Sequence, residues 1–346
     1  MRILLSSGEV SGDAIGGRLA REFRGILPSV DLAGCVGASM ESAGVRALAG
    51  IGSFSHAGWV SVLSRLPWVA WSAWSYFRRV DRFAPDLVVA VDAPGLHGPL
   101  LGRCSRKGIR CAWVAPPQLW AWKNRSVPLL RGMDVYPAHR FEIPSLERAG
   151  ANAFWWGFPG ERPCSAPPVD RPLLALFPGS RSAWRDRHAR WFVSLARQTG
   201  LPLEPVLVHP APRDGGMELG VRCLTPGEAL PAAALALCLP GTSTLQTAMW
   251  GVPTVVAARP GRIDLMIAGT RLASGSKVLP NRILGDGIFP EFYAEQATSE
   301  RVVAALRESH RDRREIASRL VGLPQALGEA AAPRRIAEHV LGRNAA

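Results

Sequence analysis

The chain has 346 residues, 47% of them hydrophobic, which is long and apolar enough for two globular domains. Its 41 Lys and Arg against 28 Asp and Glu give a formal net charge of +13, which favours nucleic acid, an anionic membrane surface or phosphorylated substrates as partners. The six scattered Cys form no zinc-binding pattern and predict free thiols. Neither a signal peptide nor a bilayer-spanning apolar run is evident, so we expect a cytoplasmic protein.

The chain opens with a strand, a loop and a helix. A short apolar strand at 2–6 is followed by the loop 8–13, which reads Gly-Glu-Val-Ser-Gly-Asp, and by a helical pattern over about 14–27. This order is typical of the start of a Rossmann-like unit. The loop lacks the GxGxxG fingerprint, so a dinucleotide cofactor is not indicated. Ser11 and Asp13 are residue types that cap helices, and we expect them to cap this one.

Residues 57–79 are rich in tryptophan and arginine. Trp68, Trp71 and Trp74 recur every three residues, which places them roughly on one side of a predicted helix. Arg65 and Pro67 interrupt the apolar run, so we do not expect a membrane-spanning helix. Trp beside Arg is typical of a helix at a membrane surface, but packing in the core or against a partner explains the pattern equally well.

Two further segments of the first half carry candidate site residues. The apolar strand 87–91 ends at Asp92, and a carboxylate at the carboxyl end of a strand is suited to act as a general base. Capping of the next helix is the alternative role. A strand at about 110–114 leads into the loop 115–123, where Trp120 and Trp122 are expected to form a rigid aromatic wall.

The segment 159–172 holds five prolines without an apolar period and is the predicted domain boundary. Beyond it, the strand 173–177 ends in Pro-Gly, where Ser180 and Arg181 offer donors to a phosphate oxygen. The strand 235–239 is followed by Gly241, Thr242 and Ser243 at the start of a helix, a pattern suited to binding an anion. An ordinary turn and an ordinary helix cap remain the alternatives for these two loops.

Two Rossmann-like halves, with anion-binding loops in the second, predict an α/β fold of the GT-B type, with two parallel sheets facing a cleft. At this level the chain resembles the lipid-A-disaccharide synthase family, glycosyltransferase family 19. The matching motifs occur in order along nearly the whole chain: the loop 8–13, Asp92-Ala93-Pro94, residues 117–122, 178–181, 241–243, 279–281 and 290–292.

The resemblance implies a hexosyltransferase of lipid A biosynthesis. Such an enzyme joins UDP-2,3-diacylglucosamine to 2,3-diacylglucosamine 1-phosphate with inversion and releases UDP, without a metal or cofactor. An acceptor and membrane domain is then expected at 1–160, and a UDP-sugar-binding domain with C-terminal helices at 161–346. The family also implies a peripheral position at the inner face of the cytoplasmic membrane, and it makes a homodimer plausible.

The resemblance also assigns roles to residues. Asp92 would deprotonate the 6-hydroxyl of the acceptor. The donor would contact Ser180, Arg181, Gly241, Thr242, Ser243, Gln246 and Asn281. The acceptor would contact Glu9, Ser11, Asp13, His97, Trp120 and Trp122. Trp68, Trp71 and Trp74 would meet the membrane.

Two positions depart from the family pattern. His97 stands where the family has asparagine, and Gln246 where it has a glutamate that binds ribose hydroxyls. A neutral Gln246 predicts weaker donor binding. Three alternatives stay open: an epimerase-like or MurG-like UDP-sugar enzyme, a non-catalytic homologue that binds lipid or protein, and a nucleic-acid-binding protein. No recognisable nucleic-acid-binding module is present, so we expect no nucleic acid partner.

Overall fold

The structure is a computed structural model that describes residues 1–54, 59–121, 127–162, 172–179, 182–209, 219–259, 275–285 and 287–342, without the side chains of 59–69 and 182–184. The chain forms two compact units. The first contains Met1–Glu161 and Leu327–Ala346, and the second contains Arg162–Thr270 and Ser274–Ala326. The end of the chain, predicted as part of the second domain, is thus grouped with the first unit.

In the described part of the first unit, seven parallel strands form a sheet in the order β3-β2-β1-β4-β5-β6-β7. The strands are β1 (Arg2–Ser7), β2 (Asp31–Val36), β3 (Arg46–Gly50), β4 (Leu87–Val91), β5 (Arg110–Val114), β6 (Asp134–Tyr136) and β7 (Asn152–Ala153). The α-helices are α1 (Val10–Ile26), α2 (Ala38–Ser42), α3 (Trp59–Phe83), α4 (Pro94–Arg106), α5 (Ile143–Arg148) and α14 (Ala332–Val340). Short 3-10 helices are η1 (Ile51–Ser53), η2 (Leu119–Ala121), η3 (Pro128–Leu130) and η4 (Arg140–Glu142).

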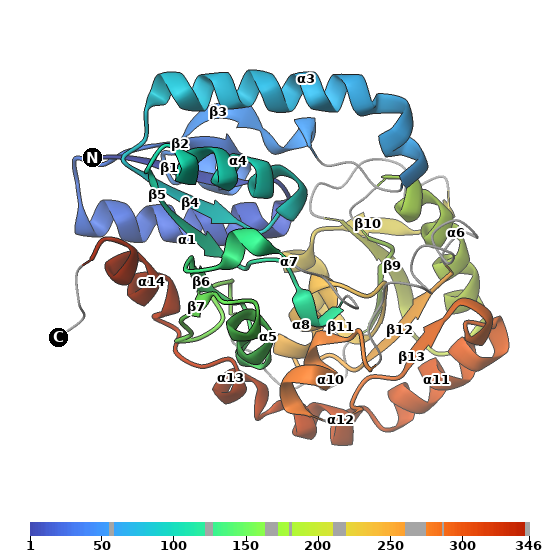
Figure 1. Ribbon diagram of the computed structural model, residues 1–346. Helices are drawn as coiled ribbons and strands as arrows, with labels where there is room; N and C mark the ends of the chain where they lie inside the picture. Colours follow the sequence, from blue (N-terminus) through green and yellow to red (C-terminus); the bar gives the residue numbers. More distant parts are fainter. Residues whose placement is uncertain are drawn as a thin grey trace. The chain divides into compact units, whose positions relative to one another are not determined.

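Helices cover both faces of this sheet (Figure 1). Because successive side chains of a strand point to opposite faces, Ile3 and Leu5 pack with α1, α2 and α14, whereas Leu4 packs with α3 and α4. The same alternation continues in β4. This double burial explains why β4 has an unbroken apolar sequence, as expected for a parallel sheet.

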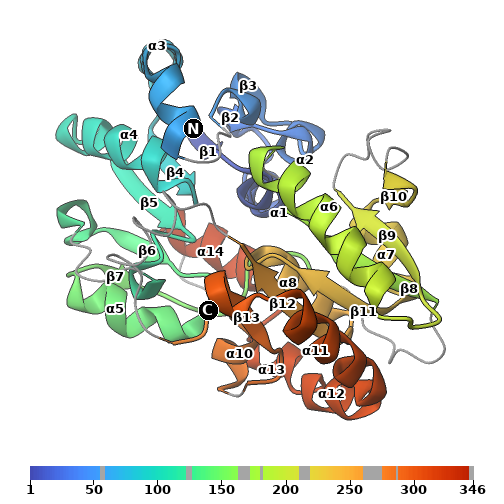
Figure 2. The ribbon, with the colours of Figure 1, turned by 90° about the vertical axis from the view of Figure 1, so that its right-hand side faces the viewer.

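In the described part of the second unit, six parallel strands form a sheet in the order β10-β9-β8-β11-β12-β13. They are β8 (Leu173–Phe177), β9 (Glu204–Val208), β10 (Arg222–Leu224), β11 (Ala233–Cys238), β12 (Thr254–Ala258) and β13 (Glu291–Tyr293). The helices are α6 (Ser182–Gln198), α7 (Pro226–Ala229), η6 (Leu230–Ala232), α8 (Thr242–Met249), α10 (Leu279–Leu284), η7 (Ala294–Gln296), α11 (Ser299–Arg311), α12 (Arg313–Leu320) and α13 (Leu323–Ala326). The helices α6 and α11 cover one face, in front of the sheet in Figure 2, and the α7–η6 segment packs on the other.

The predicted α/β fold with two parallel-sheet units is confirmed. The predicted capping of the first helix is wrong, because α1 begins at Val10, so Ser11 and Asp13 lie inside the helix. The turn before α1 is tight: a Cβ on Gly8 would lie 2.5 Å from the Cβ of Ala93. The helix α3 continues through Pro67 as one helix. Among the described helices, none is long and apolar enough to cross a bilayer.

Candidate functional site

The strand order brings candidate residues from distant segments to one edge of the first sheet. The order reverses between β1 and β4, and open parallel sheets bind ligands at the carboxyl ends of the strands at such a point. Glu9 follows β1, and Asp92 follows β4. A Cβ on Gly12 would lie 3.5 Å from the Cβ of Asp92, so the start of α1 passes close to the turn that carries the carboxylate. Both Glu9 and Asp92 are half-buried.

Asp92 lies in a strained turn. Its φ is +55°, and that of Ala93 is +46°, a left-handed conformation that L side chains other than Asn and Asp rarely adopt. The backbone N–H of Asp92 donates to the carbonyl of Val114 at 2.9 Å. The Asp92 carbonyl accepts from the indole N–H of Trp113 at 3.1 Å and from Nδ1 of His97 at 2.7 Å. Consecutive strained residues of this kind are often found at functional sites.

His97 is completely buried, and its Nδ1 contacts the backbone carbonyl of Asp92. Besides the Asp92 carbonyl, it contacts the Ser6 hydroxyl, with 2.9 Å between Nε2 and Oγ, and the Tyr76 hydroxyl donates to Ser6 Oγ at 2.8 Å. Burial lowers the pKa of His97 to about 4, although its hydrogen bond to the Asp92 backbone acts in the opposite direction. The imidazole is therefore neutral at physiological pH.

Asp13, predicted as an acceptor contact, is buried and binds backbone groups of its own unit. Its carboxylate accepts hydrogen bonds from Gly37 at 2.7 Å, from Ser39 at 2.8 Å and from Met40 at 3.2 Å. These N–H groups belong to the start of α2, where a helix leaves its first donors without internal partners. Asp13 thus connects α1 to α2. Ser11, on the same helix, is half-buried.

A buried carboxyl group that the sequence analysis did not single out lies near Asp92. Glu142, at the end of η4, is 3% exposed, and its Oε1 has no hydrogen-bond partner in the described part of the chain. The pKa of Glu142 is raised to about 8, chiefly by burial; the negative charge of Asp92 acts in the same direction, and the Trp120 side chain and the Ala138 backbone act against it. Glu142 is therefore largely protonated at pH 7. In the sequence, Glu142 is distinguished only as a charged residue that follows a strand of the same sheet.

Trp120, whose side chain interacts with Glu142, belongs to a cluster of aromatic rings. Trp120, half-buried in η2, meets the Phe141 ring edge to face with 5.3 Å between centroids. His139 stacks between Phe141 and Phe158, each at 5.5 Å, and burial lowers its pKa to about 3. Trp120 is thus part of a cluster of aromatic side chains, and the aromatic wall at the site stays a prediction. The predicted position of Trp122 lies outside the described residues.

In the second unit the strand order reverses between β8 and β11. Both predicted anion-binding loops follow these two strands. Gly179 after β8 has a φ of +91°, and Gly241 after β11 has a φ of +150°. Thr242 and Gln246 lie one turn apart in α8 and are both exposed, and Ser243 is half-buried. Ser180 and Arg181 lie outside the described residues.

Asn281, predicted to contact the donor, is buried in α10. Its amide nitrogen donates to the carbonyl of Phe289 at 2.8 Å, and its Oδ1 accepts from the N–H of the same residue at 2.9 Å. Glu291 lies 3.3 Å from the amide nitrogen and also accepts from the Tyr293 hydroxyl at 2.7 Å. The side chain of Asn281 therefore joins α10 to the segment that precedes β13.

The helix α3 combines a buried side with exposed tryptophans. Tyr76, Val80 and Phe83 are buried in the core, whereas Trp71 is 61% exposed and Trp74 is 55% exposed. The guanidinium of Arg78 lies 5.1 Å from the centre of the Trp74 ring. The side chain of Trp68 is outside the described residues. Core packing and an exposed aromatic surface, which the sequence left as alternatives, thus occur on the same helix.

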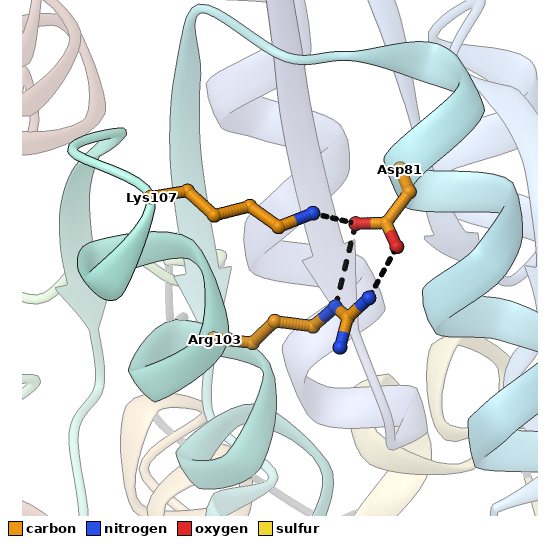
Figure 3. Close-up of polar contacts among 3 residues, drawn as sticks. All are labelled: Asp81, Arg103 and Lys107. Atoms are coloured by element: carbon orange, nitrogen blue, oxygen red, sulfur yellow. Dashed lines mark hydrogen bonds and ion pairs between the residues drawn. The ribbon is translucent and has the colours of Figure 1, made fainter.

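Asp81 connects α3 to α4 (Figure 3). Its carboxylate pairs with Arg103 at 2.5 Å and with Lys107, just after α4, at 2.6 Å. The hydrogen bond from Arg103 lowers the pKa of Asp81 below its ordinary value. These ion pairs hold α3 against the helix that carries His97. Among the described residues, no cluster of His, Cys, Asp and Glu is arranged to bind a metal ion.

Two units, each with a parallel sheet covered by helices on both faces, are the building blocks of the GT-B fold, and solved proteins of this fold resemble the chain. The glycosyltransferase of kitacinnamycin aligns over 99% of this chain and 98% of its own, with a TM-score of 0.63 and 18% identity. The UDP-GlcNAc 2-epimerase from Neisseria meningitidis, solved with UDP-GlcNAc, aligns over 99% and 100%, with a TM-score of 0.65 and 11% identity. At these identities the likeness concerns the fold alone.

Sequence comparison narrows the class to one family. The model of the lipid-A-disaccharide synthetase family matches residues 3–135 and 223–326, and the chain belongs to this family. The lipid-A-disaccharide synthase of Rhodopseudomonas palustris is 30% identical over 88% of this chain and 86% of its own. That of Anaeromyxobacter sp. (strain K) is 28% identical over 99% and 97%. The chain is accordingly an enzyme of the hexosyltransferase type.

Proposed function

We propose that the enzyme transfers 2,3-diacylglucosamine from its UDP donor to 2,3-diacylglucosamine 1-phosphate, with inversion, to form lipid A disaccharide 1-phosphate and UDP. Membership of the lipid-A-disaccharide synthase family supports the substrate class. The observation that carries the chemistry is the position of Asp92, on a strained turn at the point where the strand order of the first sheet reverses.

In the proposed reaction, Asp92 accepts the proton of the acceptor 6-hydroxyl as that oxygen attacks C1 of the donor sugar. UDP leaves from the opposite face of C1: the bond between C1 and the UDP oxygen breaks, and its electron pair leaves with UDP. A general base of this kind contributes about 10²- to 10⁴-fold to the rate. His97 is neutral and Glu142 is largely protonated, so neither carries the proposed proton-accepting role, which falls to Asp92.

The second unit is the proposed donor domain. The start of α8 presents backbone N–H groups of the Gly241–Ser243 loop, which suit a diphosphate whose negative charge grows as it leaves. Arg181 would add a guanidinium to the same group, and exposed Gln246 would meet the ribose hydroxyls. The boundary near residue 160 and the acceptor role of the first unit belong to the same proposal.

We further propose that the enzyme is peripheral at the inner face of the cytoplasmic membrane, with exposed Trp71 and Trp74 of α3 at the lipid surface. Both substrates carry acyl chains, and the formal net charge of +13 favours anionic lipid. A homodimer is part of the proposal and is testable by light scattering.

The experiment is UDP release by the purified protein in detergent, given UDP-2,3-diacylglucosamine with or without 2,3-diacylglucosamine 1-phosphate. Release that requires the acceptor is expected, together with its loss by about 100-fold or more in Asp92→Asn. Asp312→Asn, at a half-buried position just before α12, is the matched control and retains the activity.

Two outcomes would contradict the proposal. Release that does not require the acceptor, with water in its place, would favour an epimerase-like UDP-sugar enzyme. No release by a folded protein that still binds UDP would favour a non-catalytic homologue.

A further inference from the structure

Three buried side chains form a continuous hydrogen-bonded chain that ends on the backbone carbonyl of Asp92, and a fourth, Trp113, bonds the same carbonyl. The Tyr76 hydroxyl lies 2.8 Å from Ser6 Oγ, and Ser6 Oγ lies 2.9 Å from Nε2 of His97. Nδ1 of His97 lies 2.7 Å from the Asp92 carbonyl, which also accepts from Trp113. Tyr76, Ser6, His97 and Trp113 are each at most 1% exposed. The chain therefore depends little on solvent.

The direction of the hydrogen bonds follows from the last acceptor. A carbonyl oxygen only accepts, so Nδ1 of His97 must carry the proton. In a neutral imidazole Nε2 is then an acceptor, and the Ser6 hydroxyl must donate to it. Ser6 Oγ in turn accepts from the Tyr76 hydroxyl. These three side chains are therefore satisfied in one arrangement only, and His97 and Trp113 together fix the orientation of the Asp92 carbonyl.

This orientation matters because the backbone at Asp92 and Ala93 is left-handed at both residues. Such a conformation persists only where surrounding contacts determine it. The peptide group that accepts from His97 and Trp113 is the one that joins Asp92 to Ala93, so these two donors act directly on the strained turn. The direction in which the Asp92 side chain leaves the sheet edge depends on the same backbone angles.

The chain draws on elements that are far apart in sequence. Ser6 comes from β1, Tyr76 from α3, His97 from α4 and Trp113 from β5. The ion pairs of Asp81 with Arg103 and Lys107 hold α3 to α4 along the same side of the sheet (Figure 3). The turn at Asp92 is thus connected to the helix whose outer side carries the exposed tryptophans.

We propose that Tyr76, Ser6 and His97 are positioning residues, which hold the Asp92 turn in its strained conformation through a one-directional chain of hydrogen bonds. The proposal rests on the proposed function, because it assumes that Asp92 is the general base. It assigns His97 to the backbone of Asp92 and removes it from the acceptor contacts.

Substitutions of His97 test the role of its Nδ1 donor. The amide nitrogen of Asn lies about where Nδ1 lies, so His97→Asn keeps a donor to the Asp92 carbonyl, whereas His97→Leu removes it. We expect kcat to fall about 100-fold in His97→Leu, the effect of misplacing a catalytic group by about 1 Å. We expect His97→Asn to restore most of this loss. The KM for the UDP donor should stay within about twofold in both variants.

Substitutions of tyrosine test the far end of the chain. Tyr76→Phe removes one buried hydrogen bond and should lower kcat by about 2- to 10-fold. Tyr136→Phe is the matched control: its hydroxyl likewise makes a side-chain hydrogen bond, to His339 at 2.8 Å, but it belongs to the core on the opposite face of the same sheet. This control should lose stability without a change in kcat. Equal loss of kcat in both variants would overturn the proposal.

A spectroscopic measurement tests the chain without relying on activity. In the ¹⁵N spectrum of the imidazole, His97 should show a protonated Nδ1 and an unprotonated Nε2 down to about pH 5, since its pKa is about 4. An imidazolium at pH 6, or a proton on Nε2, would overturn the proposal even if the Leu variant does not fold.

The two proposals fail in different ways. Wild-type kcat in folded His97→Leu, with Asp92→Asn inactive, would overturn the positioning role and leave the general base in place. Full activity in Asp92→Asn would overturn the assignment of the base, and the positioning role with it. A 100-fold loss in His97→Leu that is rescued in His97→Asn, with Asp92→Asn inactive, supports both.

Discussion

Glu142 is expected to make the stability of the first unit depend on pH. Its pKa is about 8 in the folded protein, because burial disfavours the ionised form, against an ordinary value of 4.5. Below pH 4.5 the group is protonated in both the folded and unfolded states, so it carries no penalty. Between pH 4.5 and about pH 8, Glu142 loses its proton in the unfolded chain and keeps it in the folded chain. The free energy of unfolding therefore falls as the pH rises, and it levels off above about pH 8.

The size of the effect follows from the two pKa values. Each pH unit between them is worth about 1.4 kcal/mol, so the full penalty is about 5 kcal/mol and the penalty at pH 7 is about 3 kcal/mol. Glu142→Gln keeps the shape of the side chain and cannot ionise. The variant should gain stability over the native protein as the pH rises, by about 4 kcal/mol more at pH 8.5 than at pH 5.

Urea unfolding at pH 5, 7 and 8.5 measures this difference. Because the chain has two compact units, hydrogen exchange in peptides from β1 and β4 assigns the relevant transition to the first unit. Glu147→Gln, at an exposed position of α5, is the matched control and should show no such trend. A stability difference that is the same at all three pH values, or a Gln variant less stable than the native protein at pH 8.5, would refute the reasoning.

Three further predictions follow from other sites. Asp13→Ala should lower the free energy of unfolding by about 3–5 kcal/mol, because it leaves three backbone donors at the start of α2 without their acceptor, and Asp13→Asn should lower it by about 1–2 kcal/mol. Urea unfolding measures both values. An Ala variant as stable as the native protein would contradict the capping role. Replacing Trp71 and Trp74 with Ser should lower the affinity for vesicles of anionic lipid, measured by co-sedimentation, by about tenfold. The circular dichroism spectrum should not change. An unchanged affinity would exclude these side chains from a membrane surface. Gln246→Glu should lower the KM for the UDP donor by about fivefold, because a charged acceptor binds a ribose hydroxyl more strongly; steady-state kinetics checks this, and a higher KM would count against the contact.

The unbroken apolar runs were enough to predict the central strands of both sheets. The strands 87–91 and 173–177 have every residue buried, because helices cover both faces of a parallel sheet, and this pattern is local in the sequence. The glycine-containing loops after the strands predicted at 173–177 and 235–239 were equally visible. Strand ends at one edge of a parallel sheet meet by geometry, so the candidate positions of Asp92 and Gly241 followed from the same local signal.

The sequence could not show which polar groups bind ligands and which hold the fold together. Asp13 and Asn281 resemble ligand contacts in a linear motif, but tertiary structure directs both toward backbone groups of their own units. The burial of Glu142, which raises its pKa, could not be predicted for the same reason, because it depends on segments that only folding brings together.

The chain that ends on Asp92 shows the same limit most clearly. Ser6 lies 91 positions from His97 and 70 from Tyr76, and no periodicity links residues at such separations. Local patterns determine where strands, helices and turns form, because they depend on neighbours within a few residues. The pairing of buried donors with acceptors depends on which faces of those elements pack together, and only the tertiary structure decides that.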